Sequence, residues 1–228
     1  MIFSKEEYNH RIKKVKESMS KKGIDILIST DPSNMNYLTG YDGWSFYVPQ
    51  GIIISIDEDQ PYWFGRKQDS NGARITTFLN EENIYGYPEN LIQSPPLHPY
   101  DYVVQLIKDK KWSSNSIGVE MDSYYYTAEN HSRLKNNLTD AKFINAHLLI
   151  NWVRYIKSEN EIKYMKDAGV LVRAGMQTAF DSIKEGVKQS TVAGKIHNTL
   201  IAGNDETKMG GEYAGLGLIL ASGRSASA

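Results

Sequence analysis

The side chains best suited to bind a small molecule are two arginines and a group of aromatic residues. Arg66 and Arg224 could each hold a carboxylate through two parallel N–H donors. Trp44, Phe46 and Tyr47 could face a cation, because the faces of aromatic rings attract positive charge. These residue types predict binding chemistry for charged groups.

The aromatic residues belong to the run DPSNMNYLTGYDGWSFYVPQ, which covers residues 31–50. Aromatic residues beside glycines and Asn or Asp mark a tight exposed turn, where binding residues often lie. We therefore expect Asp42, Gly43 and Trp44 to form the ligand side. The alternative is packing in the core, since neighbouring side chains of a strand such as Phe46 and Tyr47 point to opposite faces.

Groups that could catalyse a reaction are scattered. The sequence has no cysteine, which excludes disulfides, thiolate catalysis and cysteine metal sites. No two histidines are spaced i, i+4 as a zinc-binding helix requires. His98 lies in a proline-rich loop, where it could be a ligand or simply be solvated. We assign no catalytic and no metal-binding residue to this chain.

Composition narrows the class of partner. Hydrophobic residues make up 40% and charged residues 23% of the 228 residues, which is typical of a globular protein. The net charge of -1 argues against a nucleic-acid partner, because phosphate binding needs a basic face. No apolar run approaches the roughly 20 residues that cross a membrane, and the N-terminus lacks the apolar segment of a signal peptide. We predict a cytoplasmic protein without a membrane partner.

The spacing of apolar residues predicts alternating helices and strands up to about residue 150. A helix over residues 4–22 should begin at a capping box of Ser4 and Glu7. Asp31 and Pro32 should open a short helix as N-cap and first helical residue. Strands are expected at 24–28, 51–56, 61–64, 83–87, 116–120 and 142–144, and further helices at 68–78, 100–111 and 127–138. This alternation predicts an α/β fold with a largely covered sheet.

The pattern changes near residue 150. We expect one domain over residues 1–150 and the start of another over 151–228. A long helix over 158–183 should begin at a capping box of Ser158 and Glu161 and end at Gly186. A second helix over 190–202 and a strand over 216–221 follow. A single strand needs partners, so we expect the second domain to be incomplete.

Several segments together resemble the creatinase, prolidase and aminopeptidase P family. They are NYLTGY at 36–41, IGVE at 117–120, RYIKSENEI at 154–162, GGEY at 210–213 and ASGRSASA at 221–228. The resemblance implies a creatinase-type N-terminal domain, a ribonuclease H-like mixed sheet flanked by helices. The last two segments resemble the first strands of the α+β pita-bread catalytic domain, which would be incomplete here.

Within this family, residues 31–50, 65–69 and 118–122 resemble the ectoine hydrolases, which open a cyclic amidine that carries a carboxylate. Aromatic faces suit the delocalised cation and arginine suits the carboxylate, although a zwitterionic proline dipeptide would satisfy the same groups. The expected substrate-binding residues are Asp42, Trp44, Tyr47, Arg66, Gln68 and Arg224. The alternatives are an Xaa-Pro dipeptidase or aminopeptidase and a non-catalytic dimerisation or binding module.

The resemblance also implies that the catalytic groups of the family come after residue 228. We therefore expect this chain to be inactive alone and to hold no cofactor. A divalent metal pair would belong to the full-length protein if that protein is a peptidase. In related enzymes the N-terminal domain mediates dimerisation and reaches toward the neighbouring active site, so a homodimer is expected.

Overall fold

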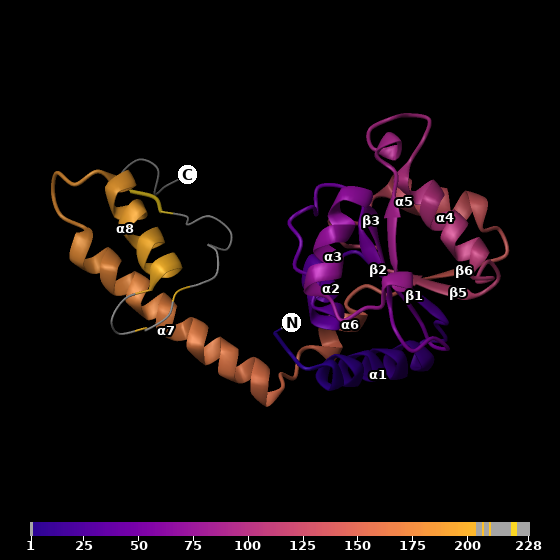
Figure 1. Ribbon diagram of the computed structural model, residues 1–228, viewed down its shortest axis with the longest axis horizontal. Coiled ribbons are helices and arrows are strands. Elements are labelled where there is room, and N and C mark those ends of the chain that lie inside the picture. The colour runs from indigo at the N-terminus through magenta and orange to yellow at the C-terminus, as the bar shows by residue number, and fades with distance from the viewer. Residues whose placement is uncertain (1, 204–206, 208–209, 211–219, 223–228) are drawn as a thin grey trace. The chain divides into compact units, whose positions relative to one another are not determined.

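The computed structural model describes residues 2–203, 207, 210 and 220–222 (Figure 1). The chain divides into two compact units, Met1–Ile156 and Lys157–Ala228. Each unit has its own helices; within the described residues the first has two large buried clusters and the second has a small one.

The first unit is built on a six-stranded mixed sheet with the order β4-β3-β2-β1-β5-β6. The strands are β1 Ile26–Ser29, β2 Gly51–Ser55, β3 Tyr62–Arg66, β4 Ile84–Tyr87, β5 Ser116–Val119 and β6 Lys142–Asn145. Strand β1 lies at the change of direction, antiparallel to β2 on one side and parallel to β5 on the other. The mixed sheet with flanking helices confirms the predicted fold class.

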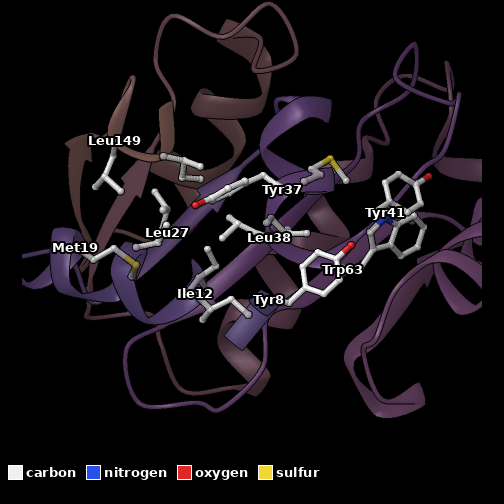
Figure 2. Close-up of a cluster of buried hydrophobic side chains, with 14 of the residues drawn as sticks. Tyr8, Ile12, Met19, Leu27, Tyr37, Leu38, Tyr41, Trp63 and Leu149 are labelled. Carbon is white, nitrogen blue, oxygen red and sulfur yellow. The ribbon is translucent and has the colours of Figure 1, made fainter. Parts of the chain in front are cut away.

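Helices cover both faces of this sheet (Figure 1). Alternate residues of β1 point to opposite faces, so Leu27 joins one buried cluster while Ile26 and Ile28 join the other. The first cluster contains side chains from α1 Lys5–Lys21, α2 Pro32–Thr39, α3 Ser70–Thr76 and α6 Leu149–Val153 (Figure 2). The second contains side chains from α4 Pro99–Asp109 and α5 Ala128–Asn137.

Local sequence sets the bounds of α2, which leads into the aromatic run. The Asp31 side chain accepts hydrogen bonds from the backbone N–H of Ser33 at 2.9 Å and of Asn34 at 3.2 Å. Pro32 occupies the first helical position, as predicted. Gly40 ends the helix with a φ of 83°, a left-handed conformation that glycine adopts without strain.

Helix α6 and the role of His98 differ from the sequence prediction. Helix α6 was not predicted, because it is only five residues long and its buried residues Leu149 and Ile150 pack against the same cluster as α1. His98, which the sequence placed in a loop, is the N-cap of α4 and is half-buried. Its Nδ1 accepts from the backbone N–H of Tyr100 at 3.1 Å, and its own backbone N–H donates to Asp101 at 2.9 Å.

The second unit contains α7 Glu159–Ser182 and α8 Gln189–Ala202. The predicted capping box at Ser158 and Glu161 is present at the start of α7. The helix ends at Ser182 with Ile183 as its C-cap, in agreement with the predicted bounds, and Gly186 lies in the turn that follows with a φ of 82°. Most of the predicted strand over 216–221 lies outside the described residues. Of the helices described, none combines the length and the apolar character needed to cross a membrane.

Candidate functional site

The aromatic run after α2 divides between core and surface. Tyr41 is buried and its ring lies 5.4 Å from that of Trp63. Trp44 and Tyr47 are 62% and 65% exposed. Phe46 is half-buried between them, with ring centroids 5.1 Å from Trp44 and 6.2 Å from Tyr47. The run therefore contributes to the core and also presents an aromatic surface.

Backbone geometry explains why the exposed rings lie where they do. The segment around Phe46 and Tyr47 is a turn instead of a strand, closed by a hydrogen bond from Val48 N–H to the Ser45 carbonyl at 3.1 Å. A side chain at Gly43 would place its Cβ 2.1 Å from the hydroxyl oxygen of Tyr41. Only glycine allows the loop to pass this close to the buried tyrosine.

The exposed rings border a pocket of about 300 Å³. One wall comes from the loop after α2, and the other comes from the end of β3 and the turn that follows it. The lining residues are Tyr41, Gly43, Trp44, Ser45, Tyr47, Arg66, Gln68, Asp69 and Gly72. Such a concave site with aromatic and a few polar groups is suited to a small ligand.

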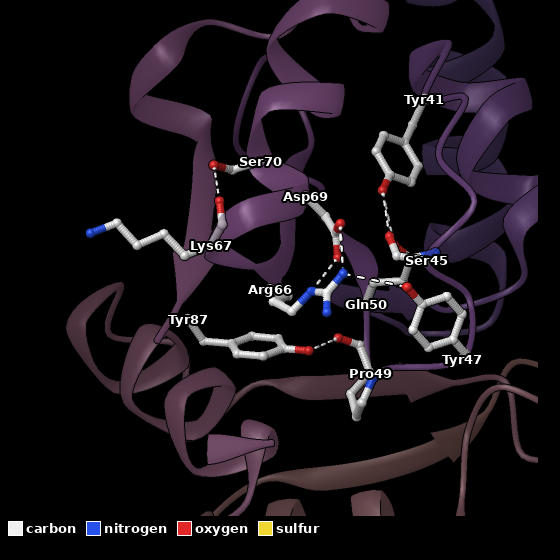
Figure 3. Close-up of polar contacts among 10 residues, drawn as sticks. All are labelled: Tyr41, Ser45, Tyr47, Pro49, Gln50, Arg66, Lys67, Asp69, Ser70 and Tyr87. Atoms are coloured by element: carbon white, nitrogen blue, oxygen red, sulfur yellow. Dashed lines mark hydrogen bonds and ion pairs between the residues drawn. The ribbon is translucent and has the colours of Figure 1, made fainter. Parts of the chain in front are cut away.

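An ion pair dominates the polar wall. Arg66 donates from Nε to Asp69 Oδ2 at 2.9 Å and from Nη2 to Asp69 Oδ1 at 3.2 Å. These hydrogen bonds raise the pKa of Arg66 above its ordinary value. Nη2 also lies 3.4 Å from the Tyr47 hydroxyl (Figure 3). The Nη1 group has no hydrogen-bond partner within the part of the chain that the structure describes, so it is the donor that Arg66 can offer a ligand.

The floor of the pocket is neutral. The Tyr41 hydroxyl and the Ser45 hydroxyl both donate to Gln50 Oε1, at 3.0 and 3.1 Å. Burial raises the pKa of Tyr41, so its hydroxyl stays protonated. Tyr87 donates to the Pro49 carbonyl at 2.6 Å and thereby holds the far end of the loop (Figure 3).

The pocket brings together four of the six predicted binding residues, namely Trp44, Tyr47, Arg66 and Gln68. Asp42 does not line it. The Asp42 side chain is exposed, and its backbone N–H donates to Thr76 Oγ1 at 3.2 Å. Arg224 lies outside the described residues.

Sequence reasoning missed Tyr41, Ser45 and Asp69 as pocket residues. Asp69 could have been found, because it follows Arg66 by three residues and carries the opposite charge. Tyr41 and Ser45 carry no such signal, since their orientation depends on packing against β3 and on Gln50.

Acidic and histidine side chains do not gather into a metal site within the described residues. His147 and Asp122 approach each other, with 3.6 Å between Nε2 and Oδ2, but they remain a pair. Two bridged cations need several carboxylates, so the described residues do not fit a divalent metal pair. We assign no metal to them.

Comparison with known proteins adds independent information. Residues 11–156 match the family described as the creatinase/prolidase N-terminal domain. The chain is 40% identical to an ectoine hydrolase of Halomonas elongata, across 99% of this chain and 57% of that protein. It is 42% identical to an uncharacterized hydrolase/peptidase of Sinorhizobium fredii, across 89% of this chain and 52% of that protein. The chain thus spans about half the length of the curated relatives it matches.

Solved structures share the fold. A prolidase from Thermococcus sibiricus superposes with a TM-score of 0.68 at 18% identity, over 85% of this chain and 49% of that one. An Xaa-Pro dipeptidase from Bacillus anthracis superposes with a TM-score of 0.64 at 19% identity, over 83% of this chain and 48% of that one. At these identities the likeness shows the fold alone.

Proposed function

Since this chain belongs to the creatinase/prolidase family, as its sequence predicted, we propose that the whole protein is a hydrolase that breaks a C–N bond of a small molecule. We propose ectoine as the substrate. The observation that carries this choice is the 40% identity to an ectoine hydrolase over 99% of the chain.

The pocket beside the aromatic run is proposed to contact this substrate. The exposed faces of Trp44 and Tyr47 suit a delocalised cyclic amidine. The Nη1 group of Arg66 suits its carboxylate, because charge-assisted hydrogen bonds are among the strongest polar contacts. The Nε and Nη2 groups of Arg66 already donate to Asp69. A bound carboxylate would therefore take one hydrogen bond from Arg66 unless Asp69 moves.

This pocket is proposed to bind without catalysing. Both oxygens of Asp69 accept hydrogen bonds from Arg66, so neither is positioned to take a proton from a substrate or a water. The Tyr41 hydroxyl is no better as an acid or base, because its pKa is raised by burial. We therefore expect purified residues 1–228 to show no turnover of ectoine or of an Xaa-Pro dipeptide.

A substitution at Trp44 tests the assignment in the whole protein. Trp44→Ala should lower kcat/KM for ectoine about five- to tenfold, the loss expected for a cation–π contact of about 1 kcal/mol. Hydrolysis is followed by chromatography of ectoine and its product. Trp152→Ala is the matched control, since Trp152 is 69% exposed and does not line the pocket. If the two variants have equal kinetics, the aromatic surface has a packing role and does not contact the substrate.

The second candidate is an Xaa-Pro dipeptidase, favoured by the fold shared with prolidases. A proline dipeptide also offers a carboxylate and an apolar ring to the pocket. The whole protein should be assayed on both substrates, with and without added divalent metal. Turnover of the dipeptide alone would replace ectoine as the substrate, and turnover of neither would favour the binding or dimerisation module.

We also propose that the whole protein is a homodimer in which the aromatic surface lies beside the subunit interface and faces the neighbouring subunit's active site. The surface carries Trp44 and Tyr47. Tyr124, which precedes the half-buried Tyr125 in the sequence, is 98% exposed. Large exposed aromatic groups commonly mark an interaction site. Light scattering coupled to size-exclusion chromatography measures the mass directly, and a monomer at all concentrations would exclude the dimer.

A further inference from the structure

Three segments that are far apart in the sequence meet in one buried hydrogen-bond network. At its centre is Glu120, which follows β5 and is 3% exposed. Its carboxylate accepts from Ser29 Oγ at 2.8 Å and from Asn34 Nδ2 at 2.8 Å. It also accepts from the backbone N–H groups of Thr30 at 2.9 Å and Asp31 at 3.2 Å. Burial raises the pKa of Glu120 above its ordinary value, and these four donors offset part of that effect.

Asn34 extends this network to the segment by which the chain leaves the first unit. Its Nδ2 donates to Glu120 and also to Asn151 Oδ1 at 3.1 Å. Its Oδ1 accepts from Arg154 Nη1 at 2.8 Å. A carboxylate on one side and a guanidinium on the other thus fix the orientation of this amide. Asn151 lies in α6 and Arg154 directly follows it.

The position of the network in the fold is informative. Strands β1 and β5 are parallel neighbours, and Glu120 and Thr30 lie just beyond their carboxyl ends. In open α/β sheets this edge is where ligands usually bind. Here the chain fills it with its own polar side chains, and two of them, Asn151 and Arg154, come from the segment by which the chain leaves the first unit.

Two loops bring aromatic rings to this part of the molecule, and both start from the network. Helix α2, which holds Asn34, leads through Gly40 into the loop with Trp44. The other loop begins directly after Glu120 and contains Tyr125, whose ring centroid is 6.0 Å from that of Phe46. The hydrogen bonds to Asn34 and helix α2 therefore connect Arg154 to the loop that forms one wall of the pocket.

We propose that Glu120, Asn34 and Arg154 are positioning residues that hold the exit segment and the aromatic loops as one rigid piece. Removing the guanidinium would leave the Asn34 carbonyl without its partner and free the amide to turn away from Glu120. A buried polar group that loses its partner is costly, so the loss would loosen α2 as well as α6. This inference concerns the placement of the pocket and is independent of the substrate.

Hydrogen exchange measured by mass spectrometry on the 228-residue chain tests the proposal. Arg154→Met keeps the aliphatic stem but removes the donors. We expect amide exchange in residues 149–153 and in residues 35–40 to accelerate about tenfold, as loss of one charged hydrogen bond predicts. Exchange in β2 and β3 should stay unchanged. Arg74→Met is the matched control, because Arg74 pairs with Glu81 at the surface and has no part in the network.

Two further variants test whether α2 and α6 are held through the same connection. Arg154→Lys can restore one hydrogen bond to Asn34, so exchange in both segments should return toward the wild-type rate. Asn34→Ala combined with Arg154→Met should exchange no faster than Asn34→Ala alone, because both changes break the same connection. Faster exchange in α6 with no change in α2 would overturn the proposal, and so would additive effects. If Asn34→Ala does not fold, the comparison of Arg154→Met with Arg154→Lys still tests the proposal.

Discussion

At the scale of single residues, the pairing of Arg66 with Asp69 determines what the pocket can accept. The side chains of these two residues are 17% and 15% exposed, so their ion pair is only partly screened by water. A ligand carboxylate that sought the whole guanidinium fork would have to displace Asp69. The pocket is therefore better suited to a ligand whose cation rests on Trp44 and Tyr47 than to a simple anion.

Arg66→Lys tests the structural role of this fork. Lysine offers a point charge in place of two parallel N–H donors, so the bidentate pair and the contact with Tyr47 should both be lost. We expect the free energy of unfolding in urea to fall by about 1 kcal/mol. Arg74→Lys is the control, since Arg74 pairs with a more exposed carboxylate. An equal or larger loss for the control would show that the fork adds no special stability.

At the scale of elements, caps were the most predictable features because they depend on neighbours in the sequence. Asp31 with Pro32 and Ser158 with Glu161 begin α2 and α7 as the sequence indicates. Helix α6 could not be predicted, because burial against α1 stabilises it and no local pattern does. The same distinction holds in the pocket. The residue types of Trp44 and Arg66 suggested binding, but the partner of Arg66 and the exclusion of Asp42 depend on how the loop folds back.

The His98 cap makes the stability of α4 depend on pH. Its Nδ1 can accept from Tyr100 only while the ring is neutral. Burial, and next the charge of Arg133, lower the pKa of His98 below its ordinary value. A depressed histidine pKa contributes stability that is present above the unfolded value and is lost as the pH falls through the folded value.

His98→Asn isolates this effect, because asparagine caps helices at any of these pH values. Between about pH 7 and pH 5, around the ordinary histidine pKa, the wild type should lose more unfolding free energy than the variant does. Urea titrations of both proteins at each pH provide the measurement. Parallel pH profiles would mean that the ring does not act as the cap in solution.

At the scale of the whole molecule, the two units differ in how much apolar surface they bury. The first unit contains the complete sheet and two large buried clusters. The second has a small cluster around Ala179, Val192 and Ile196 within the described residues. Apolar side chains of α7 such as Phe180 and Met165 are 65% and 60% exposed. Hydrophobic burial is the main stabilising term in folding, so the first unit should carry most of the stability.

Residues 1–156 expressed alone should therefore fold. We expect the urea midpoint of this fragment, followed by near-ultraviolet circular dichroism, to match that of the same region in the 228-residue chain. Within the described residues, both large buried clusters are built from side chains of residues 1–156. Residues 157–228 alone should show helical signal without a cooperative transition. A fragment 1–156 that unfolds at a much lower urea concentration would contradict this division.

The distribution of the four tryptophans gives the chain built-in optical reporters. Trp63 and Trp112 are buried, whereas Trp44 stands at the pocket and Trp152 on α6. Only the latter two should be quenched readily by a dissolved quencher such as acrylamide, and their emission should lie at longer wavelength. With Trp152 replaced by phenylalanine, the quenchable light would come from Trp44. Occupancy of the pocket could then be followed in the unlabelled protein, ligand by ligand.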